Sequence, residues 1–460
     1  MRLLLFAAFA LVGTSGCGES AAPANLDAGD DAAVDMACTP RASFAATGFY
    51  RTERDCGRWW LVDPDGKRFY STGVNHVQYQ GDYSPTTKTN PYAEAVAKKY
   101  GSEDKWAAAT VARLAAWGWN TVGSWSGDVL GPLMPYTQIL SLSGADWQSG
   151  AIPDYFADVW AKSVADKVAA SVPAHATERN LVGWFVDNEM HWGPDWRSGD
   201  DLMLEYLKLD GAAPGKQALV KLMSERHGAD IASFNRAWST TLASFAELGA
   251  LAKLPATNPT PEAAADRSAF IRAAADRFFS VTSGAIRARD ANHLVLGVRF
   301  VASLTPREVA EASAAFLDVV SVNSYEYTID PQTIFAPDRL NLLDLGAGAF
   351  LEVFARATDR PILVSEFGFR AKDSGLPNSW PPFYPTLATQ AERADRFAAY
   401  AARCHAAPWI VGYHWFEFAD QPAAGRFDGE NNNWGLVTSG DDPWEVLVAR
   451  SAKENVAPTP

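Results

Sequence analysis

The feature that most constrains the fold is a repeated order of segments, in which a helix ends at a turn residue and an apolar strand and a polar loop follow. The clearest helical segments are 105–117, 273–289, 351–357 and 390–406. The strand candidates are 69–74, 120–125, 136–140, 181–186, 293–300, 319–323, 361–365 and 409–416. Strands that alternate with helices pair in parallel, because each helix carries the chain back to the start of the next strand.

Eight such units predict an α/β fold of the (β/α)8 TIM barrel class. A doubly wound sheet is the structural alternative, but neither a GxGxxG nor a Walker-type loop follows the first strand. Residues 190–272 are long for one connection and mostly helical in pattern. We therefore expect the barrel to carry an enlarged helical insertion after strand four.

A short β-hairpin is expected before the barrel, because the turn sequence at 63–66 separates apolar strands at 59–62 and 68–74. The expected domains are a β segment at 41–67 that packs on the barrel, a catalytic barrel at 68–450 and a tail at 451–460.

The N-terminus has the pattern of an export signal: Arg2, an apolar run at 3–12, and small residues that end in Cys17. The run is too short to cross a bilayer. Because its end resembles a lipoprotein cleavage box, we expect a signal peptide at 1–17 and a lipid anchor on Cys17, with plain secretion as the alternative. Residues 18–40 are rich in Ala, Asp, Gly and Pro, which predicts a disordered tether.

The chain has four cysteines. In an oxidising compartment, with Cys17 lipidated, the simplest arrangement is one disulfide, for which we predict Cys38–Cys56, and a buried free Cys404. The sequence has no CxxC pair or His/Cys cluster that suggests a metal, and we expect no cofactor.

The net charge of −14 argues against nucleic acid and against an anionic membrane surface as partners, and it suits a neutral substrate. The chain also has 17 Trp, 14 Tyr and 24 Phe. This content favours a site in which flat rings stack on flat ligand faces, such as those of an oligo- or polysaccharide.

In a barrel of this class the active site lies at the carboxyl ends of the strands. Seven of the eight candidate strands end in polar or aromatic residues: Asn75 and His76, Trp125, Asn188 and Glu189, Arg299, Asn323 and Tyr325, Glu366, and His414, Trp415 and Glu417. The strand that ends near Ser141 is the exception. We therefore predict that these side chains meet at one mouth of the barrel.

Two carboxylates stand out, because Glu189 follows strand four and Glu366 ends strand seven. Glycoside hydrolysis needs such a pair, in which one acid protonates the leaving oxygen and the other attacks the sugar or activates water. Each carboxylate also raises the proton affinity of the other. The structural alternatives are a helix-capping role for Glu189 and a surface-loop position for Glu366.

The other strand-end residues are expected to support the pair or to bind sugar. Trp125 and Trp415 could stack on sugar rings or pack in the core, and His76 and His414 could bind hydroxyls or be structural histidines. Asn323 is expected to bind substrate. The very polar segment 420–433, with Asp428 and Glu430, suits sugar hydroxyls, although solvation or a calcium ion would also explain it.

Two residues are expected to act on the carboxylates themselves. Tyr325 could donate a hydrogen bond to Glu366 and hold it ionised, and Arg299 could pair with a carboxylate and fix its position.

Several motifs resemble those of the clan A retaining glycoside hydrolases and, more narrowly, of the agarase-type β-galactoside hydrolases of family 50. The motifs are NTVGSWS at 120–126, GWFVDNE at 183–189, SEF at 365–367, HWF at 414–416 and the polar segment 420–431. The resemblance runs from about residue 68 to residue 440.

This resemblance implies a retaining double displacement, in which Glu189 is the acid/base and Glu366 is the nucleophile. It also implies that Asn188 contacts the sugar 2-hydroxyl and that Tyr325 supports the nucleophile. The two carboxyl groups are then expected to lie about 5–5.5 Å apart.

The substrate is open at this point. Agarases of this family often carry an N-terminal carbohydrate-binding β domain, whereas only residues 41–67 separate the expected tether from the expected barrel. Oligosaccharides, mannan or glucan are therefore alternatives to agar. A non-catalytic glycan-binding surface lipoprotein is the alternative of another class, and the intact glutamate pair argues against it. An esterase is disfavoured by the lack of a GxSxG motif.

Overall fold

The computed structural model describes residues 38–255, 258–329, 331, 335, 350–456 and 458. The predicted signal peptide at 1–17, with Cys17, and most of the predicted tether at 18–40 lie outside these residues. Cys38 and Cys56 are both disulfide-bonded, as predicted, and Cys404 is a buried free thiol. Among the described helices, none combines the length and the apolar character that a membrane span requires.

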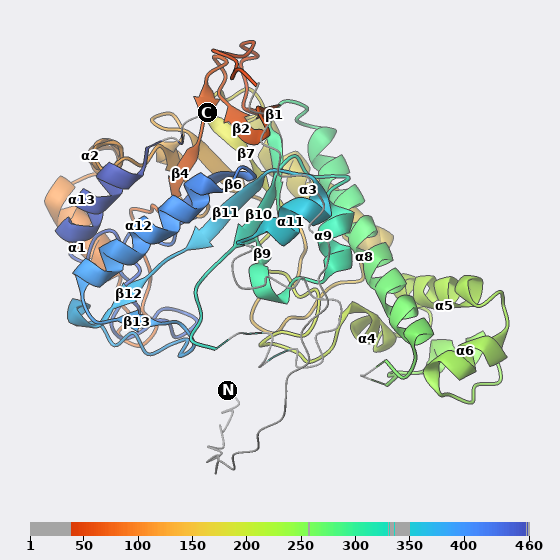
Figure 1. Cartoon of the computed structure of the whole chain (residues 1–460). Coiled ribbons are helices and arrows are strands. Elements are labelled where there is room, and N and C mark those ends of the chain that lie inside the picture. The colour runs from red at the N-terminus through yellow and green to blue at the C-terminus, as the bar shows by residue number, and fades with distance from the viewer. Residues whose placement is uncertain are drawn as a thin grey trace, which may run out of the picture. The chain divides into compact units, whose positions relative to one another are not determined.

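Parallel strands form the centre of the described chain (Figure 1). Their order in the sheet is β8-β7-β6-β5-β4-β14-β11-β10-β9. They are β4 (Ser71–Val74), β5 (Thr121–Val122), β6 (Tyr136–Ile139), β7 (Leu181–Phe185), β8 (Leu294–Gly297), β9 (Phe300–Val301), β10 (Val320–Asn323), β11 (Ile362–Phe367) and β14 (Ile410–Trp415).

The sheet closes into a barrel because β8 and β9 belong to one predicted strand that is interrupted at Val298 and Arg299. β8 stands at one end of the sheet order and β9 at the other, where Phe300 pairs with Val322 of β10. The backbone N–H of Asp318 also donates to the carbonyl of Val295 at 3.0 Å, which joins β8 to the chain entering β10. The prediction of a (β/α)8 barrel is confirmed.

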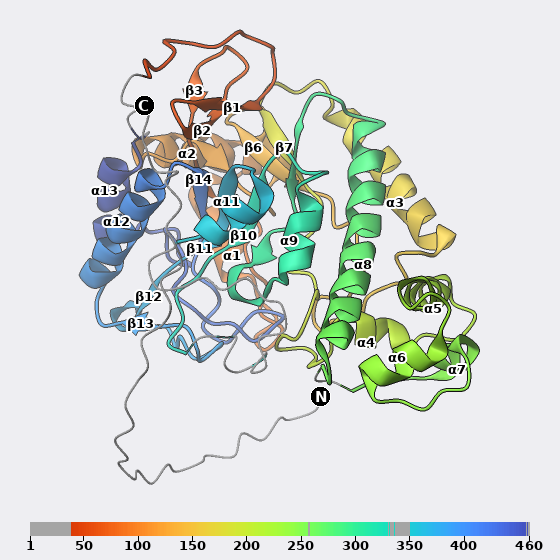
Figure 2. The same ribbon diagram turned by 45° about the vertical axis from the view of Figure 1, so that its right-hand side comes forward.

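Helices surround the barrel strands, as Figures 1 and 2 show for α3, α8, α9, α11 and α12. The described α-helices outside the insertion are α1 (Pro91–Tyr100), α2 (Glu103–Ala116), α3 (Asp158–Ser171), α9 (Arg307–Ser313), α11 (Glu352–Thr358), α12 (Gln390–Ala406) and α13 (Glu445–Glu454). The last of these continues past the expected domain end at 450.

Local capping explains where the helices begin. The side chain of Ser102 accepts a hydrogen bond from the backbone of Lys105 at the start of α2, and Thr389 does the same for Glu392 at the start of α12. Such side chains satisfy backbone N–H groups that have no partner inside the first helical turn. The apolar stripe of α12, which includes Phe397 and Cys404, is buried.

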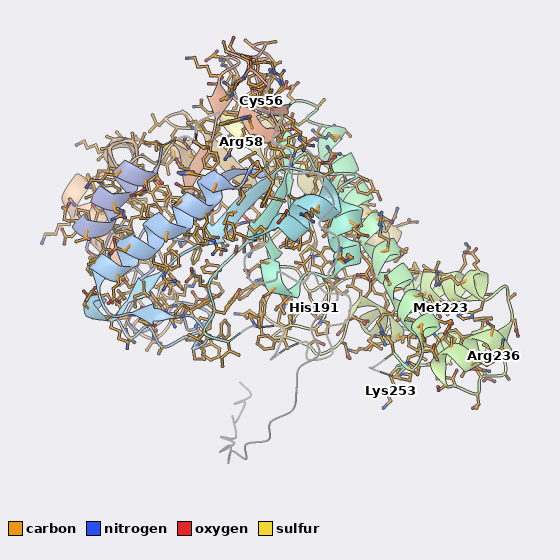
Figure 3. The ribbon with its side chains drawn as sticks, viewed as in Figure 1. Cys56, Arg58, His191, Met223, Arg236 and Lys253 are labelled. Carbon is orange, nitrogen blue, oxygen red and sulfur yellow. The ribbon has the colours of Figure 1, made fainter. Side chains whose placement is uncertain are left out.

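The predicted insertion after strand four is present. It consists of α4 (Leu202–Leu207), α5 (Pro214–Arg226), α6 (Ile231–Trp238) and α7 (Phe245–Ala250), followed by the long α8 (Pro261–Arg287). Figure 3 shows Met223 and Arg236 on this insertion, on the far side of α8 from the strands. α8 begins earlier than the predicted residue 273, because Thr260 caps it and Pro261 occupies its first turn.

The N-terminal β segment closes the amino end of the barrel. The predicted hairpin is formed by β2 (Arg58–Val62) and β3 (Arg68–Phe69), and β1 (Arg51–Asp55) adds a third antiparallel strand. Leu61 packs in one cluster with Val182 and Leu363, which come from barrel strands. The amino end is thus filled by apolar side chains, and the carboxyl ends are left for a site.

Candidate active site

Glu366 lies near the end of β11 and is only 5% exposed. Its Oε1 is 2.9 Å from Nη2 of Arg299, and its Oε2 accepts a hydrogen bond of 2.8 Å from the hydroxyl of Tyr325. Both carboxylate oxygens therefore face donors, which favours the anion. Burial raises the pKa of Glu366 to about 7, while Arg299 opposes the rise and the charge of Glu189 adds to it.

Glu189 follows β7 and is held in place by its neighbours. Its backbone is left-handed, with φ at 45°, and its Oε1 accepts a hydrogen bond of 3.0 Å from Nδ2 of Asn323. The same amide lies 3.2 Å from Oδ1 of Asn188, and the hydroxyl of Ser365 donates to Asn323 Oδ1 at 2.7 Å. Asn323 thus orients both residues of the Asn188–Glu189 pair.

Several strand ends at the mouth adopt the same uncommon backbone conformation. His76, Trp125 and Arg299 have φ values of 56°, 57° and 52°, close to that of Glu189. Residues with a Cβ rarely adopt this left-handed region, and such conformations concentrate at functional sites. The conformation turns each chain sharply as its strand ends, so that the side chain is redirected at the mouth.

Arg299 lies at the base of the site. Its guanidinium stands 4.2 Å from the ring centroid of Trp125, and its Nη2 donates to the carbonyl of Ser365 at 2.9 Å. The expectation that Arg299 pairs with a carboxylate is confirmed. The side chain is fully buried, and its place in the substrate-binding set stays a prediction. The same holds for Asn323, which is buried and contacts Glu189.

Two predicted sugar-binding residues of strand eight point elsewhere. His414 is buried inside the barrel, where its Nε2 lies 2.9 Å from the hydroxyl of Ser71. Trp415 points to the opposite side, donates from Nε1 to the carbonyl of Trp434 at 2.8 Å, and packs against Phe367. Neighbouring side chains alternate between the two faces of a strand, and neither of these reaches the mouth. Both are therefore corrected to structural residues.

The burial of His414 has an electrostatic consequence. Burial, with a smaller effect from the charge of Arg299, lowers the pKa of the His414 imidazole to about 3. The His414 ring is therefore neutral near pH 7, whereas the Arg299 guanidinium is cationic.

A polar network occupies the mouth on the side of β4 and β14. Nδ1 of His76 contacts Oε2 of Glu417, and Nε2 of His76 lies 3.9 Å from Asp82. Arg426 lies 3.8 Å from Asp82 and 4.0 Å from Glu417. The three residues His76, Asp82 and Glu417 are close enough to hold a metal ion, but the Arg426 guanidinium already supplies positive charge at that place.

Asp428 and Glu430 belong to the same network, because Arg426 Nη2 lies 2.9 Å and 3.1 Å from their carboxylates. Burial raises the pKa of Glu430, and Arg426 opposes the rise. Both acidic side chains are partly exposed, so they remain candidates for binding sugar hydroxyls.

The segment after Glu189 is fastened to the site. Nδ1 of His191 lies 2.9 Å from Asp195, and Nη2 of Arg197 donates to the backbone carbonyl of Glu189 at 2.8 Å. His191, labelled in Figure 3, is buried.

Two residues near the carboxylates, Tyr384 and Asp82, have no clear signal in the sequence. The ring of Tyr384 lies 5.1 Å from that of Tyr325, and the charges of Glu189 and Glu366 both contribute to the raised pKa of Tyr384, in which burial is the larger cause. Asp82 comes from an irregular loop, where neither helical nor strand spacing marks a side chain. Arg426 lies in the predicted polar segment 420–433.

Comparisons with known proteins find agarases among the similar sequences and structures. Beta-agarase A from Vibrio sp. (strain JT0107) is 30% identical over 469 residues, covering 86% of this chain and 44% of that protein. The solved structure of PfGH50B has a TM-score of 0.75 at 26% identity, and that of an exo-beta-agarase has a TM-score of 0.76 at 26% identity. Each match covers 90% of this chain and 66% of the solved chain.

The chain spans about half the length of the curated relatives that it matches. No family model matches the sequence. These likenesses show that the chain is similar to agarases over most of its length, and they confirm the resemblance that its motifs indicated.

Proposed function

We propose that this protein is a retaining glycoside hydrolase that cleaves β-linked galactans, with Glu366 as the nucleophile and Glu189 as the acid/base. The observation that carries the proposal is the setting of Glu366, whose two oxygens face Arg299 and Tyr325. A carboxylate held by two donors is preorganised as an anion at a fixed position, which suits nucleophilic attack. The relatives named as agarases support a galactan as the substrate.

The reaction would proceed in two displacements. In the first, an oxygen of Glu366 bonds to the anomeric carbon while Glu189 gives its proton to the departing glycosidic oxygen. In the second, Glu189 takes a proton from water, the water oxygen bonds to the anomeric carbon, and the bond to Glu366 breaks. The configuration of the anomeric carbon is inverted twice and therefore retained.

The surrounding residues support this division of roles. Asn323 donates to Glu189 Oε1, which leaves the other oxygen of that carboxyl group for proton transfer. Asn188 is partly exposed beside it and is placed to accept or donate a hydrogen bond to a sugar hydroxyl. The buried Arg299 keeps positive charge under Glu366 through both steps.

The test uses an activated aryl β-galactoside with Glu366→Ala and Glu189→Ala variants. Each variant should lose most turnover, about 10³-fold or more. Azide should restore product formation and yield the α-galactosyl azide with Glu366→Ala and the β-galactosyl azide with Glu189→Ala. Glu326→Ala, which removes a partly exposed carboxylate paired with Arg396, is the matched control. Full activity in either catalytic variant would overturn the assignment.

The substrate is tested separately, by product analysis on agarose, galactan, mannan and glucan oligosaccharides. Release of products from agarose or galactan oligosaccharides is expected. Calorimetric binding without release of any product would instead favour the non-catalytic glycan-binding alternative.

A further inference from the structure

One buried arginine is directed at the backbone of the residue assigned as the acid/base. Nη2 of Arg197 donates to the carbonyl of Glu189 at 2.8 Å, and the Arg197 side chain is only 2% exposed. On the other side of the same residue, the backbone N–H of Glu189 lies 3.2 Å from the carbonyl of Val298 and 3.3 Å from that of Arg299. Both polar groups of the Glu189 backbone are therefore held, one by the barrel and the other by Arg197.

This support matters because the Glu189 backbone is left-handed, with φ at 45°. A residue with a Cβ keeps that conformation only where its surroundings hold it there. The barrel fixes the N–H side of Glu189, and the Arg197 guanidinium binds the carbonyl side. Without that second hydrogen bond, the peptide after Glu189 can rotate toward the ordinary regions of φ and ψ, and the carboxyl group moves with it.

The Arg197 guanidinium is fixed by further hydrogen bonds. Its Nε and Nη2 donate to Oδ2 of Asp195 at 3.0 Å and 2.6 Å, and its Nη1 donates to the carbonyl of Trp147 at 3.2 Å. A planar guanidinium carries donors at fixed angles and can bind all these acceptors at once, whereas a lysine cannot. Arg197 thus joins the loop after β7, which carries Glu189, to the loop after β6, which carries Trp147.

Asp195 supplies the negative charge that a buried arginine needs. Its side chain is 5% exposed, its Oδ1 accepts from the backbone N–H of Arg197 at 2.7 Å, and its Oδ2 lies 2.9 Å from Nδ1 of His191. Although burial raises the pKa of Asp195, the hydrogen bonds with His191 and Arg197 hold that pKa below its ordinary value. The Asp195 carboxylate is therefore ionised at neutral pH, and it keeps the guanidinium in place.

The helical insertion after strand four supports the same loop. The hydroxyl of Ser198 donates to Oε1 of Glu205 in α4 at 3.0 Å, and Nε2 of His191 lies 3.8 Å from the same carboxylate. Asp201, which caps α4, pairs with the fully buried Arg267 of α8. The loop that carries Arg197 is therefore fastened to the barrel at one side and to the insertion at the other.

We propose that Arg197 is a positioning residue for proton transfer by Glu189, and that Asp195 keeps Arg197 in place. Through the hydrogen bond to the carbonyl, Arg197 holds the Glu189 carboxyl group within reach of the glycosidic oxygen and does not itself touch the sugar. Proton transfer requires donor and acceptor at hydrogen-bond distance, and a displacement of about 1 Å can cost about 10²-fold in rate. The proposal rests on the proposed function, because it concerns the acid/base step of that reaction.

The test compares two aryl β-galactosides that differ in their need for a proton. Dinitrophenolate departs without protonation, whereas phenolate departs well only when an acid protonates the glycosidic oxygen. Arg197→Met should therefore lower kcat/KM for the phenyl β-galactoside about 10-fold to 100-fold and hardly change kcat/KM for the dinitrophenyl β-galactoside. Arg197→Lys should restore part of the loss, because an ammonium group can still donate to the Glu189 carbonyl.

A second substitution tests the part given to Asp195. Asp195→Asn should show the same selective loss as Arg197→Met, but a smaller one. The variant with both substitutions should lose no more than Arg197→Met alone, because both changes break the same connection. The matched control is Arg113→Met on α2, which breaks a 2.8 Å pair with the buried Asp441. At temperatures where it is folded, this control should keep kcat/KM for both substrates.

The second displacement gives an independent readout. With the dinitrophenyl substrate, removal of the sugar from Glu366 limits kcat wherever the base that activates water is poorly placed, so kcat should fall in Arg197→Met. Azide should restore kcat, because its nitrogen bonds to the anomeric carbon as the bond to Glu366 breaks and no proton has to be removed. The product should be the β-galactosyl azide.

Equal losses of kcat/KM with both substrates would show that Arg197 only stabilises the fold, and they would overturn the proposal, as would no loss with either substrate. If Arg197→Met does not fold, the same comparison is made with Arg197→Lys and Asp195→Asn, in which a selective loss supports the proposal and an equal loss overturns it.

Glu189→Ala separates these outcomes from failure of the proposed function. It should show the same selective loss of kcat/KM as Arg197→Met, in larger measure. If Glu189→Ala affects both substrates equally, the acid/base assignment fails and the role of Arg197 fails with it. If the loss is selective in Glu189→Ala but not in Arg197→Met, the acid/base assignment stands and the positioning role alone is overturned.

Discussion

Arg299 and Glu366 form a buried ion pair, with 2.9 Å between Nη2 of Arg299 and Oε1 of Glu366. The arginine is fully buried and the glutamate nearly so. Water can therefore screen neither charge well, and each charge is stabilised mainly by the other. Arg299 lies at the break between β8 and β9, where its left-handed backbone directs the side chain inward to this pair.

Replacement of Arg299 by Met should lower kcat/KM by about 10²-fold or more, because the anionic form of Glu366 loses its cationic partner. The pKa of Glu366 should rise above its present value of about 7, and the acidic limb of the pH profile should move to higher pH. Loss of one member of a buried pair typically costs about 3–5 kcal/mol of stability. Urea unfolding and pH–rate profiles measure the two effects.

The matched control for this variant is Arg356→Met, which breaks the exposed pair of Arg356 with Glu352. Exposed pairs contribute about 0–1 kcal/mol, so this variant should keep both its stability and its pH profile. A pH profile of Arg299→Met that coincides with that of the unaltered protein would contradict the role given to Arg299.

The titration of Glu366 should affect activity and stability in opposite directions. Its pKa is about 7 in the folded protein, against 4.5 ordinarily. Because the nucleophile must be ionised, kcat/KM should rise as the pH increases through about 7. Between pH 4.5 and 7 the folded protein holds a proton that the unfolded chain has released, so this carboxyl group makes stability fall as the pH rises, by up to about 3 kcal/mol.

Comparison with Glu366→Gln isolates this contribution, because glutamine does not titrate. The difference in unfolding free energy between the two proteins should change between pH 4.5 and 7 and become constant above that window. A difference that stays constant across the whole range would show that the folded protein does not raise the pKa of Glu366.

Removal of the Tyr325 hydroxyl should weaken the nucleophile without removing it. Tyr325→Phe loses the 2.8 Å hydrogen bond to Glu366 Oε2, so kcat should fall about 10-fold to 100-fold and the acidic limb should shift upward. Tyr50→Phe, at the closed amino end of the barrel, is the control and should alter neither. Steady-state kinetics across the pH range measure both effects. If the acidic limb of the pH profile of Tyr325→Phe did not shift, the Tyr325 hydroxyl would have no influence on Glu366.

The sequence alone predicted the barrel and the positions of Glu189 and Glu366, because strand order determines which residues end at the mouth. The contact between Tyr325 and Glu366 was also predicted and is present. These predictions were correct because they depend on the spacing of apolar residues along the sequence. That spacing marks the strands, the helices between them, and the polar residues at which each strand ends.

The predictions are wrong where the spacing of apolar residues gives no information. His414 and Trp415 are neighbours in a strand that is buried on both faces, so the apolar pattern cannot tell which side chain points inward. Asp82, Tyr384 and Arg426 come from irregular loops whose paths depend on distant contacts, such as the one between Arg426 and Asp82. The start of α8 was predicted too late because the cap at Thr260 was not recognised.

The corrected position of Trp415 predicts a contrast with Trp125. Trp415→Ala should cost about 3–5 kcal/mol of stability, because it leaves a cavity beside Phe367 and removes the hydrogen bond to Trp434. Its kcat/KM should be unchanged at temperatures where the variant is folded. Trp125→Ala should cost less stability, since Trp125 is partly exposed. It should nevertheless lower kcat/KM, because it removes the ring that contacts the Arg299 guanidinium.

Thermal unfolding and kinetics on an aryl β-galactoside distinguish the two tryptophans. If Trp415 formed a sugar platform, its removal would instead raise KM in a fully stable protein. Because the Trp415 indole is fully buried and its N–H is already bonded to a carbonyl, the loss is expected in the unfolding temperature and not in KM.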